Sequence, residues 1–205
     1  MRKQAAKKLA KATEGELAAL AMEKARVLIE IAASKNESSW TERGYDEVEF
    51  LIAPNPGEEP KPIARIASGG ELSRVALALK TCTASNAAPA KGKRATNPSS
   101  NQRTLVFDEV DAGVGGGAAE AVGRRLKRLS GSNQLLCVTH LPQIAGFADH
   151  HFSVAKHEES GRTMAIVTEL NGPERAQEIG RMLSGERITP EALRHAKQLI
   201  KMAGE

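Results

Sequence analysis

Aromatic side chains are scarce in this sequence of 205 residues, in which four Phe, one Tyr and one Trp make up 3 % of the chain. A protein that binds single strands by stacking on their bases needs exposed aromatic rings. The composition therefore argues against that class, and the core must depend on Leu, Ile, Val and Ala. The hydrophobic fraction of 40 % and the charged fraction of 26 % are ordinary for a globular protein.

Cysteines and long apolar runs are also few. Cys82 and Cys137 lie far apart, outside any CxxC or Cys/His ligand spacing, which argues against a disulfide or a zinc site and indicates a reducing compartment. No apolar run approaches the roughly 18–20 residues that span a bilayer, and no secretory segment follows the basic N-terminus. We expect a cytoplasmic protein without a membrane partner. The net charge of +4 permits contact with nucleic acid without demonstrating it.

The residue patterns predict an α/β protein. We expect a helix in residues 2–25, which is either one amphipathic surface helix or the tail of a coiled coil. Residues 83–102 contain no large apolar side chain and are predicted to be a disordered insertion whose basic residues are solvated. The remaining predicted elements are strands at 26–33, 45–52, 104–107 and 134–138, a hairpin of 151–157 with 163–170, and helices at 71–81, 118–129, 174–183 and from 190.

The sequence lacks a Gly-x-x-x-x-Gly-Lys-Ser/Thr loop, the motif that holds nucleotide phosphates in P-loop ATPases. It nevertheless contains Ser68-Gly69-Gly70-Glu71 at the start of a predicted helix. Two glycines let backbone N–H groups approach an anion, and the positive end of the helix points to the same place. Ser68 adds a hydroxyl donor. An ordinary turn leading into a helix remains an equally good interpretation of these four residues alone.

Two predicted parallel strands end in polar residues. Asp108-Glu109 follows the first strand, where one carboxylate can hold Mg²⁺ and the next can polarise an attacking water. A glycine-rich turn that begins at Asp111 comes next. His140 follows the second strand and can donate to a γ-phosphate, although a lone His at such a position is more often structural. Ligands of open α/β sheets bind beyond the carboxyl ends of strands, where these residues are expected.

The order of these motifs resembles the heads of ABC-type ATPases: signature loop, Walker B strand, D-loop and switch histidine. Three phrases narrow the resemblance to the RecN family of bacterial SMC-like DNA repair ATPases. They are Glu47-Val48-Glu49-Phe50-Leu51-Ile52-Ala53-Pro54-Asn55-Pro56-Gly57, Ile66-Ala67-Ser68-Gly69-Gly70-Glu71-Leu72-Ser73-Arg74 and Phe107-Asp108-Glu109-Val110-Asp111-Ala112-Gly113-Val114-Gly115-Gly116. Thr139-His140-Leu141-Pro142-Gln143-Ile144-Ala145 fits as well, and the match covers nearly the whole chain.

The resemblance implies the C-terminal lobe of an ATPase head, a mostly parallel sheet flanked by helices. Residues 1–25 would be the end of a coiled-coil arm, and 26–205 the lobe itself. The P-loop would lie in an N-terminal lobe of the same protein, before a long coiled coil. This chain alone is therefore expected neither to bind ATP tightly nor to hydrolyse it. Its implied partners are that lobe, a second copy of the head, and DNA of the nucleoid.

The resemblance also implies residue roles. Ser68, Gly69, Gly70 and Glu71 would bind ATP, with Ser68 and the glycine backbone contacting the γ-phosphate of ATP held on an opposing head. Asp108 would serve Mg²⁺, Glu109 would be the catalytic base, Asp111 would lie at the dimer interface, and His140 would sense the γ-phosphate.

Together these roles predict an ATPase that clamps DNA during recombinational repair of double-strand breaks. Two alternatives remain at this point. One is another SMC-like or ABC-type ATPase of chromosome maintenance, and the other is a non-catalytic module for head dimerisation.

Overall fold

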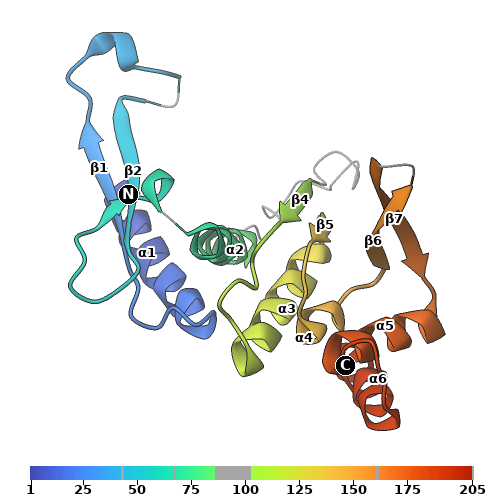
Figure 1. The fold of residues 1–205 in the computed structure, drawn as a ribbon. Helices are drawn as coiled ribbons and strands as arrows, with labels where there is room; N and C mark the ends of the chain where they lie inside the picture. The colour runs from blue at the N-terminus through green and yellow to red at the C-terminus, as the bar shows by residue number, and fades with distance from the viewer. Residues whose placement is uncertain (43, 67, 86–102, 160–161, 205) are drawn as a thin grey trace, which may run out of the picture. The chain divides into compact units, whose positions relative to one another are not determined.

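The computed structural model describes residues 1–205 except residues 43, 67, 86–102, 160–161 and 205 (Figure 1). The helices are α1 (Arg2–Ala19), α2 (Gly69–Ser85), α3 (Gly116–Ser130), α4 (Pro142–Ala145), α5 (Gly172–Ser184) and α6 (Pro190–Ala203), with 3-10 turns η1 (Glu37–Ser39) and η2 (Ile63–Arg65). The strands are β1 (Arg26–Ala33), β2 (Asp46–Ala53), β3 (Lys61–Pro62), β4 (Thr104–Phe107), β5 (Gln134–Cys137), β6 (His151–Glu159) and β7 (Arg162–Leu170).

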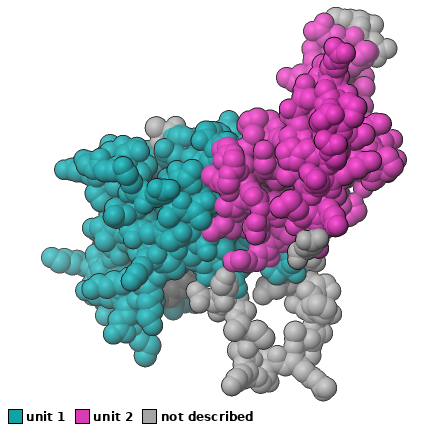
Figure 2. Space-filling model, turned by 90° about the horizontal axis from the view of Figure 1, so that it is seen from below, with its two compact units in different colours: residues 1–114, 129–138 teal, residues 115–128, 139–205 magenta. Residues whose placement is uncertain are grey.

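The chain divides into two compact units, coloured separately in Figure 2. Unit 1 consists of Met1–Val114 and Leu129–Val138, and unit 2 consists of Gly115–Arg128 and Thr139–Glu205. Unit 1 holds an antiparallel sheet in the order β1-β2-β3, and α1 contacts both β1 and α2 (Figure 1). Val27 of β1 pairs with Ile52 of β2, and both side chains are buried, so the apolar alternation of the two strands supplies one wall of the core.

Helix α1 ends at Ala19, short of the expected residue 25. Ala21 adopts a left-handed backbone conformation with φ of 61°, and the N–H of Met22 donates to the carbonyl oxygen of Leu17 at 3.0 Å. This turn carries Leu20 and Met22 into the core and reverses the chain into β1. The helical spacing seen in the sequence therefore stops at the turn, and a coiled-coil arm over residues 1–25 stays a prediction.

Strands β4 and β5 pair in parallel, with Phe107 opposite Cys137. Because paired residues share a face, one face of this pair presents Val106, Leu136 and Val138, which are 66 %, 50 % and 63 % exposed. Phe107, on the other face, is buried. Parallel sheets are normally covered on both faces, so the solvent exposure of this apolar face is unusual.

Unit 2 contains the hairpin β6–β7 and the helices α4, α5 and α6. Ala145, Ile179 and Ala196 form its helical core, with Met182, Leu183, Leu199 and Ile200 packed against it. Asn171 starts α5 with a capping box, in which its side chain and that of Glu174 bond reciprocally to the main chain. Thr189 caps α6 by accepting from the N–H of Ala192.

The α/β class is confirmed, with helices and small sheets. Parallel pairing in the described ranges is confined to β4–β5. The expected hairpin is present and slightly longer, and α2 extends through Ser85 into the segment predicted as disordered. The rest of that segment, residues 86–102, lies outside the described residues. In the part of the chain that the structure describes, no helix is long and apolar enough to cross a membrane.

Candidate functional site

Ser68 caps the N-terminus of α2. Its side-chain oxygen accepts from the N–H of Glu71 at 3.4 Å, and its carbonyl oxygen accepts from the N–H of Leu72 at 3.0 Å. Ser68 and Gly69 are both exposed. A helix of this length presents its first N–H groups and the positive end of its dipole at such a terminus. The turn can therefore receive an anion, as expected for a phosphate-binding loop.

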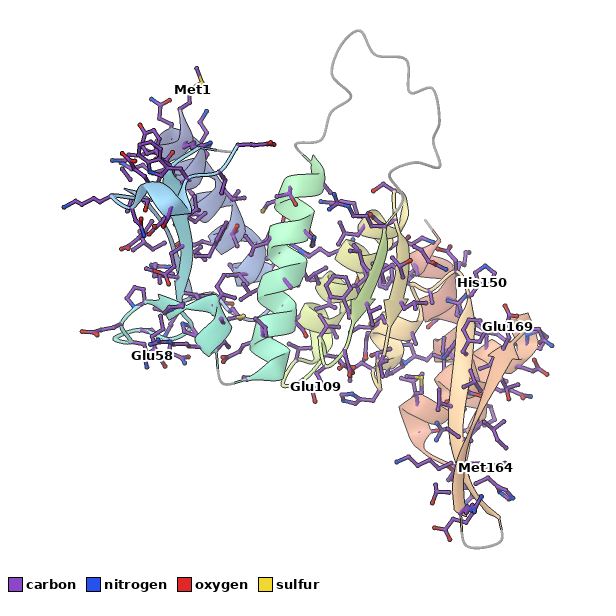
Figure 3. The ribbon with its side chains drawn as sticks, turned by 90° about the horizontal axis from the view of Figure 1, so that it is seen from above. Met1, Glu58, Glu109, His150, Met164 and Glu169 are labelled. Carbon is purple, nitrogen blue, oxygen red and sulfur yellow. The ribbon has the colours of Figure 1, made fainter. Side chains whose placement is uncertain are left out.

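The first turn of α2 packs against residues Asp108–Ala112, which we call the carboxylate loop. A Cβ atom at Gly69 would collide with the carboxylate oxygen Oε2 of Glu109. A Cβ atom at Gly70 would lie 2.7 Å from the Cβ atom of Ala112 and 3.2 Å from the carbonyl oxygens of Glu109 and Ala112. Close packing against the loop backbone therefore requires glycine at position 70, whereas at position 69 the end of the Glu109 side chain would have to move. Figure 3 shows Glu109 at this end of α2.

The carboxylate loop places two acidic side chains at the surface directly after β4. Asp108 and Glu109 are exposed, and Oδ1 of Asp108 accepts from the N–H of Glu109 at 2.9 Å. Glu109 has φ of 55°, which is uncommon for a residue other than glycine and costs conformational energy. Buried Val110 anchors the middle of the loop. The strained turn directs the Glu109 side chain toward the start of α2.

Asp111 is 4 % exposed, so its side chain is part of the interior of unit 1. The interface position that the sequence resemblance implies for this residue stays a prediction. Burial, as the largest cause, and the negative charges of Asp111 and Asp108 together raise the pKa of the Cys137 thiol to about 12. The carboxylate loop and the end of β5 therefore share one electrostatic environment.

His140 belongs to unit 2 and is exposed. It follows Thr139, whose Oγ1 accepts from the N–H of Leu141 at 3.0 Å and shapes the turn into α4. The other residues expected at the site come together in unit 1: Ser68, Gly69, Gly70, Glu71, Asp108, Glu109 and Asp111. The role of His140 remains a prediction from the sequence.

Two further residues of α2, Ser73 and Arg74, to which the sequence motifs assign no role, contact the carboxylate loop. The hydroxyl of Ser73 donates to the carbonyl oxygen of Asp108 at 2.6 Å, and Nη1 of Arg74 donates to the carbonyl oxygen of Ala112 at 2.6 Å. They follow Gly69 and Gly70 by four residues each, which puts all four on one side of the helix. In the sequence, the only indication of this contact is that spacing of four residues after the two glycines.

The site's chemistry fits a magnesium nucleotide. Mg²⁺ is usually bound through one or two carboxylates together with substrate phosphates and water, rather than by an all-protein cage. Asp108 offers one exposed carboxylate at a strand end, and the α2 N-terminus offers N–H donors for phosphate. No group of three or more His, Cys, Asp or Glu side chains suited to a metal occurs among the described residues.

Solved structures show which fold the chain has. The Smc head domain with a coiled coil and joint from Pyrococcus yayanosii aligns with 87 % of this chain and 29 % of its own, at a TM-score of 0.54 and 22 % identity. The Smc head domain from Pyrococcus furiosus, with an extended coiled coil and bound to the C-terminal domain of ScpA, aligns with 87 % and 38 %, at a TM-score of 0.50 and 22 % identity. The chain therefore has the fold of part of an Smc head domain.

Sequence comparison finds relatives that are similar over nearly the whole chain. The DNA repair protein RecN of Bacillus subtilis (strain 168) is 41 % identical over 217 residues, which cover 100 % of this chain and 35 % of that protein. RecN of Streptomyces coelicolor is 43 % identical over 211 residues, which cover 98 % of this chain and 35 % of that protein. No protein-family model matches. The resemblance to the C-terminal part of RecN is confirmed, and the chain spans about a third of the length of these relatives.

Proposed function

We propose that this chain is the C-terminal lobe of an ATPase head in a longer DNA repair protein. Two such heads would hold ATP between them, and hydrolysis would gate the clamping of DNA during recombinational repair of double-strand breaks. The packing of the α2 N-terminus against the carboxylate loop is the observation that supports this proposal most directly. It joins an anion-binding helix end and two exposed carboxylates in one compact unit.

The residues of α2 are assigned to the nucleotide of the opposing head. The Ser68 hydroxyl and the N–H groups of Gly69 and Gly70 would bind its γ-phosphate, because all three lie at the positive end of the helix. Glu71 contributes its backbone N–H to the same turn, where Ser68 accepts it.

The carboxylate loop is assigned to the chemistry. Bound Mg²⁺ would neutralise developing charge on the phosphates, and Asp108 would hold it. Glu109 would accept the proton of the attacking water, which requires a carboxylate within hydrogen-bond reach of that water. Asp111 would lie at the interface of the two heads, and His140 would sense the γ-phosphate, as the resemblance implies.

The remainder of the longer protein supplies the P-loop and covers the exposed face of β4–β5. Val106, Leu136 and Val138 present a contiguous apolar face on a two-stranded parallel sheet, which is too small to be independently stable. The relatives are about three times as long as this chain, so a partner lobe within the same protein is available. Cytoplasmic location at the nucleoid, and DNA as a ligand, belong to the same proposal.

ATP hydrolysis by the full-length protein tests the assignment of Glu109. We expect Glu109→Gln to lower kcat by about 10²–10⁴-fold, because the amide cannot accept the proton. Glu120→Gln is the matched control, since Glu120 lies on α3 in an ion pair with Arg124 and should leave kcat unchanged. Equal hydrolysis by wild type and Glu109→Gln contradicts the assignment, and absence of hydrolysis in the wild type favours a dimerisation module.

DNA binding is tested separately by its dependence on salt. A clamp that contacts the phosphate backbone releases counterions, so its affinity should fall steeply as salt concentration rises. The full-length protein is titrated with duplex DNA at several salt concentrations, with and without ATP. An affinity that does not change with salt contradicts backbone clamping and leaves the ATPase assignment untouched.

A further inference from the structure

Helix α2 and the carboxylate loop are joined by contacts that are polar and lie at both ends of the loop. Ser73 donates to the carbonyl oxygen of Asp108, the first residue of the loop, and Arg74 donates to that of Ala112, the last. Both donors lie on the side of α2 where the two glycines make their close approach. One helix therefore binds both the first and the last residue of the loop.

Arg74 is an unusual residue for this purpose. Its side chain is only 7 % exposed, although a buried guanidinium loses hydration that one hydrogen bond does not replace. Its Nε atom is buried, and no group among the described residues accepts a hydrogen bond from it. Glu71, one turn earlier, is the charged neighbour that favours the cation. Burial of this guanidinium costs free energy of folding, which indicates that Arg74 serves to hold the loop in position and not to stabilise the fold.

The loop needs such support because its backbone is strained. Glu109 has a positive φ, and within the loop its shape is closed by the N–H of Ala112, which donates to the carbonyl oxygen of Glu109 at 3.0 Å. The carbonyl groups at the two ends would otherwise face water, where the loop could relax to a lower-energy conformation. Such relaxation would displace the Glu109 carboxylate.

We propose that Ser73 and Arg74 are positioning residues, which fasten the carboxylate loop to α2 so that the phosphate-binding turn and Glu109 move as one body. The proposal rests on the ATPase function proposed above. In a pair of heads, the α2 turn contacts the nucleotide of the opposing head, whereas Glu109 serves the nucleotide of its own head. Nucleotide at one site would thereby set the position of the base at the other.

Unit 2 provides matched controls for both residues. Nη2 of Arg175 donates to the carbonyl oxygens of Ala145 and Gly146 at 3.2 and 2.8 Å, and its Nε is likewise buried without an acceptor among the described residues. The hydroxyl of Ser184 donates to the carbonyl oxygen of Gly180 at 3.0 Å. Arg175→Met and Ser184→Ala thus remove the same kinds of side-chain hydrogen bond to main-chain carbonyl oxygens, but within unit 2 and not at the carboxylate loop.

The experiment compares ATP hydrolysis by full-length Arg74→Met, Arg74→Lys and Ser73→Ala with the two controls. We expect kcat to fall about ten-fold or more in Arg74→Met and several-fold in Ser73→Ala, with KM for ATP nearly unchanged, because displacement of a catalytic group by about 1 Å can cost 10²-fold. Arg74→Lys keeps a donor and should recover part of the loss. Equal kcat in Arg74→Met and Arg175→Met overturns the proposal.

Hydrogen exchange provides a readout that does not depend on catalysis. In the full-length protein, Arg74→Met should accelerate exchange of the Ala112 amide, which is bonded to the Glu109 carbonyl oxygen, whereas Arg175→Met should not. An unchanged Ala112 amide overturns the positioning role. If instead the amide responds but the wild-type protein does not hydrolyse ATP, the proposed ATPase function fails while the fastening of the loop stands.

Discussion

The two units each contain an arginine that bonds to main-chain carbonyl groups, but the two arginines hold different kinds of structure. In unit 1, Arg74 holds an exposed loop that carries Asp108 and Glu109. In unit 2, Arg175 ties α5 to the end of α4, next to an apolar core that contains Ala145 and Ile179. Packed apolar side chains can preserve the arrangement in unit 2, whereas the carboxylate loop depends on polar contacts and on Val110.

A rigid backbone is needed for activity only where it carries a reacting side chain. Both arginines have their pKa lowered by burial, so both are costly to desolvate. Removing either should therefore change stability by a similar and modest amount, about 1–3 kcal/mol for a lost hydrogen bond to a charged group. Only in unit 1 does the tethered backbone carry a strained residue with an exposed carboxylate. The same substitution should consequently affect activity in one unit and stability alone in the other.

The alkylation rate of Cys137 reports the negative charge around the carboxylate loop in unit 1. Because burial, Asp111 and Asp108 raise the pKa of its thiol to about 12, from an ordinary value of 9.0, the thiolate at about pH 8 should be some 10³-fold scarcer than in the unfolded chain. We expect iodoacetamide to alkylate Cys137 in the native chain about 10³-fold more slowly than in denaturant, as followed by mass spectrometry of the peptide.

Cys82 is the control, since it is also a reduced thiol and is buried in the core of unit 1. Slow alkylation of both cysteines is expected, but Asp108→Asn should accelerate alkylation only at Cys137. Native Cys137 that reacts within about ten-fold of its unfolded rate would contradict the electrostatic environment assigned to the carboxylate loop.

Close packing in the two units can be compared by adding one methyl group to each. Gly70→Ala would bring its Cβ atom to 2.7 Å from the Cβ atom of Ala112 and to 3.2 Å from two carbonyl oxygens, so the loop backbone must shift. We expect kcat for ATP hydrolysis by the full-length protein to fall by roughly 10²-fold. In Gly180→Ala the nearest atom to the new Cβ is Cγ2 of Ile188 at 3.2 Å, and the Leu193 backbone lies at an ordinary contact distance of 3.8 Å. The substitution does not touch the carboxylate loop and should leave kcat within about two-fold.

A Gly70→Ala protein with normal kcat and normal melting temperature would show that α2 does not constrain the carboxylate loop. Alanine is a better helix former than glycine by about 1 kcal/mol, so helix propensity alone would raise stability. A lower kcat without a lower melting temperature would therefore locate the effect in the loop rather than in the helix.

Local patterns in the sequence predicted much of this arrangement. Ser68 and the two glycines start a helix, and Asp108-Glu109 ends a strand, because capping, turn and strand chemistry act over a few residues. The partners of Ser73 and Arg74 lie 35 and 38 residues away, so no local pattern could reveal them. The early end of α1 depends on the left-handed Ala21, which the helical spacing of the apolar residues does not encode. The burial of Asp111 is likewise a result of tertiary packing.

The smallest expected effect is a loss of stability at acidic pH, which arises from protonation of His151 in unit 2. Burial lowers the pKa of His151, and the positive charge of Arg175 lowers it further, against the opposing influence of Glu178. The unfolded histidine, with a pKa near 6.5, therefore binds protons more readily than the folded one. This contribution to stability is fully present above about pH 6.5 and is lost as the pH falls through the folded pKa.

We expect the melting temperature of the chain to drop between about pH 7.5 and pH 5.5, and the drop to shrink by a few degrees in His151→Gln. His150→Gln is the control, because His150 is exposed beside Glu169 (Figure 3). The Arg175→Met variant should also reduce the drop, since it removes a charge that disfavours the protonated His151, whereas Arg74→Met should not. If Arg74→Met reduces the drop as much as Arg175→Met does, the charge of Arg175 has no specific effect on His151. The electrostatic difference between the two units would then be contradicted.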